Sequence, residues 1–213
     1  MIPSLRYTLV GDGSSDSALM PLLRWTLLRT GTPLALLPSW ADPYLIRAES
    51  GGLAARLQNA LELYPCDLLF VHRDAEKQDP ELRRTEVENA LSQLSAPPPA
   101  LCVIPVRMTE AWLLIDEAAI RRAADNPKGS VPLTLPLLKD LEDLPDPKQK
   151  LNELLRTACE LRGRRLAQFR RDEAARRVRV ADLMDDFSPL LRLPAFQRLQ
   201  EETHALLEAQ GWV

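Results

Sequence analysis

An alternation of strand-like and helix-like patterns over the first 116 residues is the strongest constraint on the fold. Short apolar runs predict strands at residues 5–10, 33–38, 67–72 and 101–106. Helices are expected between them, at residues 16–28, 51–64 and 80–94. Strands that alternate with helices are joined by crossover connections, which favour parallel pairing and place helices on both faces of the sheet. The sequence therefore predicts an α/β fold with a mostly parallel, four-stranded sheet flanked by helices.

The pattern changes after Asp116, where the strand-like runs stop. Residues 125–147 are rich in proline and predict an irregular connection, and the pattern is helical from Pro147 onward. We therefore expect an α/β core at residues 1–124 and a helical extension at residues 125–213 that packs on this core.

Charge and cysteine usage bear mainly on the cellular compartment. The formal net charge of −3 indicates no particular class of partner. Cys66, Cys102 and Cys159 lie far apart and form no CxxC pair, which favours a reducing compartment and argues against a zinc site. The N-terminus lacks a signal-peptide pattern, and no window is apolar enough to span a bilayer. We expect a cytoplasmic protein without membrane contact, and the sequence is also compatible with a homo-oligomer.

Acidic residues follow three of the predicted strands. Asp12 comes after the first strand, Asp74 and Glu76 after the third, and Glu110 shortly after the fourth. Because ligands bind at the carboxyl ends of the strands in open α/β sheets, these acids are expected to converge on one edge. Gathered carboxylates repel one another unless a cation joins them, and Mg²⁺ prefers oxygen ligands. The pattern therefore predicts a divalent metal site.

Each of these acids also has a purely structural interpretation. Asp12 lies between two glycines, which is typical of a turn, and Asp16 either completes the acidic cluster or caps the following helix. Asp74 and Glu76 are compatible with a solvated loop. Glu110 is compatible with the first turn of a helix, where its charge complements the helix dipole. His72 is interpreted as a strand-end residue rather than as a metal ligand.

Several short motifs resemble those of a known family. Residues 12–16 (DGSSD) resemble the first motif of the TOPRIM domain, and residues 74–76 (DAE) resemble its second motif. Residues 110–116 (EAWLLID) and 147–151 (PKQKL) are similar to segments of TOPRIM-like bacterial proteins that are often found beside phage-defence ATPases. The resemblance implies a Rossmann-like TOPRIM core and relates the chain to the TOPRIM domains of overcoming-lysogenization nucleases.

The resemblance also implies an activity and the roles of individual residues. Such domains use their acids to hold Mg²⁺ during phosphodiester chemistry, so the chain is expected to be a metal-dependent nuclease in a bacterial defence system. The implied roles are metal binding by Asp12, Asp74 and Glu76, catalysis by Asp12 and Glu110, and support by Asp16 and Asp116. Mn²⁺ is an alternative to Mg²⁺. Because the chain has no G-x-x-x-x-G-K-[ST] loop, any ATPase partner is a separate chain.

Two departures from the TOPRIM pattern leave other functions open. Asp12 stands where the family has Glu, and Glu76 stands where it has Asp. Both replacements keep the charge but change the reach of the side chain. The alternative is a catalytically inactive module that regulates, or is regulated by, a partner ATPase. A phosphohydrolase that acts on small molecules is a third interpretation.

A basic segment at residues 162–179 contains eight arginines against two acids. Arginine binds phosphate through a planar fork, and a stripe of arginines is typical of a nucleic-acid footprint. The residues expected to contact nucleic acid are Arg162, Arg164, Arg165, Arg170 and Arg171. The alternative is a solvated helix face, or ion pairs with the acids of residues 140–146 and 185–186.

Overall fold

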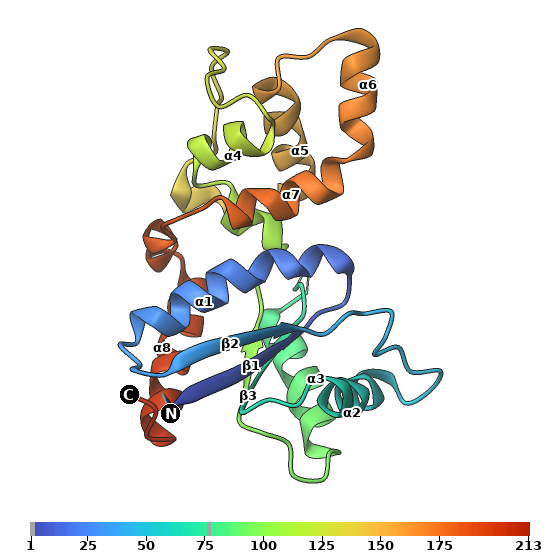
Figure 1. The fold of residues 1–213 in the computed structure, drawn as a ribbon, viewed down its shortest axis with the longest axis vertical. Coiled ribbons are helices and arrows are strands. Elements are labelled where there is room, and N and C mark those ends of the chain that lie inside the picture. The colour runs from blue at the N-terminus through green and yellow to red at the C-terminus, as the bar shows by residue number, and fades with distance from the viewer. Residues whose placement is uncertain (1–2, 76–77) are drawn as a thin grey trace.

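A four-stranded parallel sheet forms the centre of the protein (Figure 1). The computed structural model describes residues 3–75 and 78–213. The strands are β1 (Ser4–Val10), β2 (Ala35–Trp40), β3 (Leu68–His72) and β4 (Ala100–Val103). They are arranged in the order β2-β1-β3-β4, and all three pairings are parallel. The predicted α/β fold with a parallel four-stranded sheet is confirmed.

The strand boundaries follow from where backbone pairing is available. β2 begins two residues later than predicted because its register is set by β1, with Ser4 opposite Ala35. Pro38 is accommodated within β2 because this strand lies at the edge of the sheet, where no further strand needs its missing N–H. β4 ends at Val103, before Pro105, rather than extending to residue 106.

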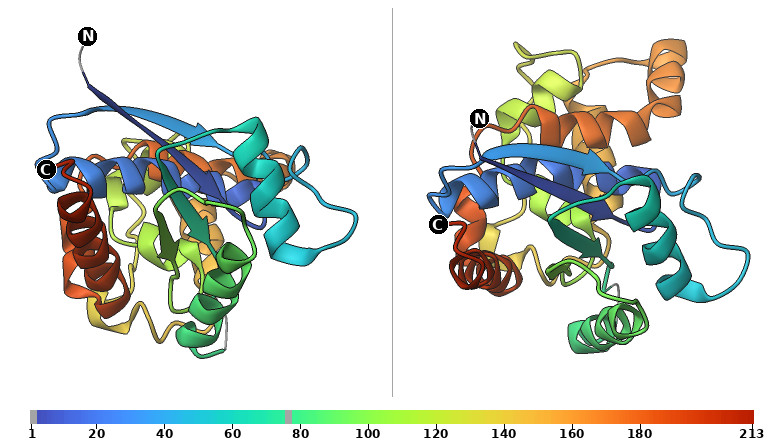
Figure 2. Two further views of the ribbon diagram at one scale, coloured as in Figure 1. Left: turned by 90° about the horizontal axis from the view of Figure 1, so that it is seen from below. Right: turned by 60° about the horizontal axis from the view of Figure 1, so that its bottom comes forward.

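Helices cover both faces of the sheet (Figure 2). One face is covered by α2 (Gly52–Leu63) and α3 (Pro80–Ser92), whose Leu57 and Val87 share a buried cluster with Leu69 and Val71 of β3. The other face is covered by α1 (Leu19–Arg29) and by helices from the C-terminal half. A 3₁₀ turn, η1 (Ser14–Ala18), precedes α1 where the sequence predicts a continuous helix from residue 16.

The C-terminal half is helical, as its sequence pattern predicts. Its elements are η2 (Thr109–Leu113), α4 (Glu117–Ala123), η3 (Leu138–Asp140), α5 (Pro147–Ala158), α6 (Gly163–Arg171), α7 (Glu173–Asp182), η4 (Ser188–Arg192) and α8 (Pro194–Ala209). Leu155, Val180 and Phe196 join the same buried cluster as Tyr7 and Phe70 of the sheet. In contrast, α6 buries only Phe169 and lies at the periphery of the molecule, far from the sheet (Figure 1). The predicted boundary near residue 124 stays a prediction.

None of the helices within residues 3–75 and 78–213 combines the length and the apolar character needed to cross a membrane. The cytoplasmic location stays a prediction.

Candidate functional site

The candidate site lies at the carboxyl edge of the sheet, between β1 and β3. The chain leaves β1 toward β2 on one side and returns to form β3 on the other side, so the strand order reverses here. Such a reversal leaves a crevice at the carboxyl ends of the two strands, which is where ligands bind in open α/β sheets. The loop after β1 and the end of β3 therefore meet at the position most suited to a site.

Asp16 holds the loop after β1 in place. Its Oδ2 atom accepts hydrogen bonds from the backbone N–H groups of Asp12, at 2.8 Å, and Gly13, at 3.0 Å. Gly11 is required beside it, because a Cβ at this position would lie 2.7 Å from the same oxygen. Asp16 is not the N-cap of the following helices, since Gly13 precedes η1 and Ala18 precedes α1. Its side chain is buried and lines the small cavity described below, and a role in an acidic cluster stays a prediction.

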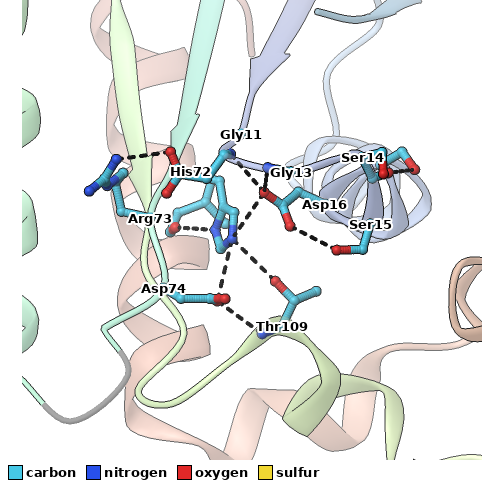
Figure 3. A network of polar contacts seen from close by, with 12 residues as sticks. Gly11, Gly13, Ser14, Ser15, Asp16, His72, Arg73, Asp74 and Thr109 are labelled. Atoms are coloured by element: carbon cyan, nitrogen blue, oxygen red, sulfur yellow. Dashed lines mark hydrogen bonds and ion pairs between the residues drawn. The ribbon is translucent and has the colours of Figure 1, made fainter. Parts of the chain in front are cut away.

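His72 is the buried centre of the site (Figure 3). Its Nδ1 atom lies 2.9 Å from the carbonyl oxygen of Val103, which only accepts, so Nδ1 carries a proton. Its Nε2 atom lies 3.4 Å from Oδ1 of Asp74 and 3.9 Å from Oδ2 of Asp16. The Oγ1 atom of Thr109 lies 3.3 Å from Nε2. The nitrogen that gains or loses a proton therefore faces two carboxylates.

The surroundings of His72 favour its protonated form. Burial opposes a charged ring, but the hydrogen bond to Asp74 and the negative charges of Asp74 and Asp16 outweigh it, with help from the Val103 carbonyl. Together they raise the pKa of His72. The sequence analysis interpreted His72 only as a strand-end residue and did not predict its contacts with the two carboxylates. The signal that was present is a histidine two residues before an aspartate at the end of a buried strand.

A small cavity of about 70 Å³ lies next to this histidine. Carboxylates of Asp16, Asp74 and Glu110 line it, and so do the cationic side chains of Lys148 and Arg177. Asp74 is held at the cavity by the backbone N–H of Thr109, which donates to its Oδ1 atom at 3.1 Å. The structure thus brings two of the predicted acids, Asp74 and Glu110, to one cavity.

Glu110 and Arg177 form a buried ion pair at this cavity. The Nε atom of Arg177 lies 3.1 Å from Oε1 of Glu110, and each side chain is only 8% exposed. Burial raises the pKa of Glu110, which the charge of Arg177 only partly offsets. Nη1 of Arg177 also donates to Asn152, at 3.0 Å. Neither Arg177 nor Lys148 was expected at the site, although Lys148 belongs to the 147–151 motif.

Asp12 lies apart from these acids. Its Oδ1 atom accepts hydrogen bonds from Nη1 of Arg56 and from Nη1 of Arg73, both at 2.9 Å. It lines a second cavity of about 420 Å³ rather than the 70 Å³ cavity. The structure therefore separates Asp12 from Asp74 and Glu110, because two arginines from α2 and from the end of β3 hold its carboxylate.

The described residues do not by themselves fit a metal site. Within residues 3–75 and 78–213, no three His, Cys, Asp or Glu side chains are placed to share a metal ion. Glu76, which the sequence expects as the third ligand, lies outside the described residues. Binding of Mg²⁺ or Mn²⁺ stays a prediction.

Comparisons with known proteins identify no relative. No protein-family model matches the chain, and neither a curated protein nor a solved structure is detectably similar to it. The resemblance to TOPRIM-like proteins therefore stays a prediction.

The remaining predicted site residues lie outside both cavities. Asp116 caps α4, because its Oδ1 atom accepts a hydrogen bond from the N–H of Ala119 at 2.9 Å. The five arginines expected to bind nucleic acid are all exposed, namely Arg162, Arg164, Arg165, Arg170 and Arg171. None of them forms an ion pair with an acid in the described part of the chain. Arg176 and Arg179 of α7 instead pair with Asp125.

Proposed function

We propose that this chain cleaves phosphodiester bonds of nucleic acid at the carboxyl edge of its sheet. One observation carries the proposal: carboxylates and cationic side chains share a small cavity at the position where α/β sheets bind ligands. Lys148 has no ion-pair partner within 4.0 Å among residues 3–75 and 78–213, so its ammonium group is available for a phosphate oxygen. The exposed arginines of α6 are consistent with a polyanionic substrate.

The chemistry expected at the cavity follows from the environment of each group. Glu110 is the general acid–base group, because it lines the cavity and because burial raises its pKa, which makes the carboxyl group a weaker acid that holds a proton more readily. Asp74, whose Oδ1 atom lies 3.4 Å from Nε2 of His72, orients water or the substrate. His72 itself does not line the cavity and acts as a positioning residue.

We expect the proposed cleavage to require a divalent cation. In a nuclease, Mg²⁺ supplies polarisation of the phosphate and activation of water. Because the described residues do not gather three ligands, we assign no step to the ion.

One observation favours an inactive binding module as the second candidate. The carboxylate of Asp12, which the sequence predicts to be catalytic, is engaged by both Arg56 and Arg73. A carboxylate held by two guanidinium groups is poorly placed to bind metal or transfer a proton. Under this alternative, the edge of the sheet binds nucleic acid or a partner ATPase without cleaving anything.

Nuclease assays on the purified chain test the proposal. Labelled single-stranded DNA, double-stranded DNA and RNA are incubated with Mg²⁺, Mn²⁺ or EDTA. We expect Asp74→Asn and Glu110→Gln to lower the cleavage rate by ~10²–10⁴-fold, because each removes a group positioned at the cavity. Asp140→Asn, on the surface of η3, is the matched control and is expected to cleave like the wild type.

Asp12 separates the two candidates. Asp12→Glu restores the residue usual in TOPRIM domains and is expected to keep or raise activity if Asp12 takes part in catalysis, whereas Asp12→Asn abolishes it. If the wild type and Asp12→Glu are both inert with every metal and substrate, also in the presence of candidate ATPases, the proposal is wrong and the binding module takes its place.

A further inference from the structure

The 420 Å³ cavity beside Asp12 has no role in the chemistry described above. It lies between the loop after β1 and the loop that connects β2 to α2, and Tyr44, Arg47 and Arg56 line it. Figure 1 shows the β2–α2 loop projecting from the molecule at the carboxyl edge of the sheet. Its volume is within the range of pockets that hold small organic ligands, which is roughly 300–1,000 Å³.

The loop presents an aromatic side chain on an anchored turn. The N–H groups of Leu45 and Ile46 donate to the carbonyl of Asp42, and the N–H of Tyr44 donates to the Asp42 side chain at 2.9 Å. Ile46 is fully buried and fastens the turn to the core. Tyr44 is nevertheless 80% exposed. An ordered turn thus holds out an aromatic ring that contributes almost nothing to packing.

The charge at this cavity favours an anion. Two guanidinium groups, of Arg47 and Arg56, face one carboxylate, of Asp12. Arg56 is partly engaged, since its Nη1 atom donates to Asp12 and its Nη2 atom to the carbonyl of Gly11. Arg47 has no ion-pair partner within 4.0 Å in the described portion of the chain. Its guanidinium fork is therefore available to a phosphate group.

We propose that this cavity binds one nucleotide of a single-stranded nucleic acid, with the base stacked on Tyr44 and a phosphate on Arg47. Aromatic side chains stack on any base, and a nearby cation holds the backbone, which is the combination that single-strand-binding proteins use. The inference rests on the proposed function, because it adds a substrate-binding site next to the candidate active site. It specifies a single strand, since the bases of a duplex are not free to stack on a protein ring.

Fluorescence anisotropy tests the site without any need for cleavage. A labelled ten-residue deoxythymidine oligonucleotide is titrated with full-length protein in EDTA at low salt. We expect Tyr44→Ala to weaken binding by roughly 5- to 150-fold, the fold-change that corresponds to the loss of one stacked base. Tyr44→Phe keeps the ring and is expected to bind like the wild type. Leu45→Ala is the matched control, because Leu45 is 64% exposed on the same turn and does not line the cavity.

The phosphate contact is tested in the same way. Arg47→Ala is expected to weaken binding and to reduce the slope of log affinity against log salt by about 0.7, the value for one phosphate contact on a single strand. Arg24→Ala removes the same charge from the exposed side of α1 and is expected to leave the slope unchanged. Equal affinities for the wild type, Tyr44→Ala and Arg47→Ala, or no binding by the wild type, would overturn the inference.

Two further arms locate the source of the ligand and separate the two proposals. Thymidine monophosphate is expected to compete only at far higher concentration than the oligonucleotide. If thymidine monophosphate competes at the same concentration as the oligonucleotide, the ligand is a free nucleotide, and the inference of a single-stranded ligand is wrong. A strand that binds through Tyr44 but is never cleaved contradicts the proposed activity and supports the site. Cleavage by the wild type and Tyr44→Ala with the same KM contradicts the site and supports the activity.

Discussion

Tyr7 carries a polar atom into the core of the sheet. The residue lies on β1, fully buried, with its ring packed edge-on against Phe70 of β3 at a centroid distance of 5.9 Å. Its hydroxyl oxygen has no hydrogen-bond partner among the residues that the structure describes. Burial raises the pKa of Tyr7 to about 12, which the charge of Arg24 only partly offsets. The hydroxyl therefore makes stability sensitive to alkaline pH.

Tyr7→Phe is expected to leave stability near pH 7 unchanged or slightly higher, because it removes a buried polar atom that is not hydrogen-bonded. In the wild type, the unfolded chain releases the Tyr7 proton near its ordinary pKa of 10.0, before the folded chain does so near 12. Stability is therefore complete below the lower value and falls as the pH rises through the higher one.

Urea denaturation at pH 8 and pH 11 measures this effect. Between these two pH values, the wild type is expected to lose roughly 1 kcal/mol more of its free energy of unfolding than Tyr7→Phe. If both proteins lose the same amount, the Tyr7 hydroxyl has a partner or reaches solvent in the folded protein.

At the scale of elements, α7 connects the C-terminal half to the candidate site. It packs on η1 and on α4, and its Arg177 forms the buried ion pair with Glu110 of η2. A second ion pair joins α5 to the start of α7, with Nε of Arg156 lying 2.6 Å from Oε1 of Glu173. The 70 Å³ cavity is thus lined by side chains from the sheet edge and by side chains from the C-terminal half, such as Arg177 of α7.

Arg177→Met is expected to lower the free energy of unfolding by about 3 kcal/mol, because it removes the guanidinium group that contacts the buried carboxylate of Glu110 and leaves only the more distant Lys148 as a cation. Arg179→Ala is the matched control on the same helix. Its pair with Asp125 is about half exposed, so the expected loss is below about 1 kcal/mol. Chemical denaturation of both variants measures the free energy of unfolding. Equal losses would show that the buried ion pair stabilises the fold no more than the exposed one.

At the scale of the whole molecule, α6 lies at one end, far from the sheet (Figure 1). The chain has a formal net charge of −3, yet α6 presents exposed arginines that form no ion pair with the described acids. The helix contributes one buried side chain, Phe169, over which the guanidinium of Arg176 stacks at 4.0 Å from the ring centroid. Its outer surface is therefore free of any packing role and suited to a polyanion.

Replacement of Arg164, Arg165, Arg170 and Arg171 by Ala is expected to flatten the salt dependence of nucleic-acid binding. Each lost phosphate contact reduces the slope of log affinity against log salt by about 0.7 to 0.9. The melting temperature should hardly change, because all four side chains are exposed. Titrations of labelled DNA at several salt concentrations measure the slope. An unchanged slope would assign this surface to a protein partner or to solvent.

The sequence by itself determined the order of the elements and the position of the site edge. Apolar runs such as residues 67–72 predict strands because burial on both faces requires continuous apolar side chains. Crossover connections then make the sheet parallel, which places the ends of β1, β3 and β4 along one edge. Local pattern and topology alone placed Asp74 and Glu110 at this edge, and the structure brings both to one cavity. Their roles stay predictions.

Only the tertiary structure decided which charges meet at that edge. Asp12 and Arg73 are 61 positions apart in the chain, and their pairing withdraws Asp12 from the other acids. Arg177 reaches Glu110 from α7, and His72 joins Asp16 to Asp74. Such contacts depend on side-chain directions and on helices that pack from distant segments. The periodicity of apolar residues indicates which face of a helix or strand is buried, but it does not indicate which other element packs against that face.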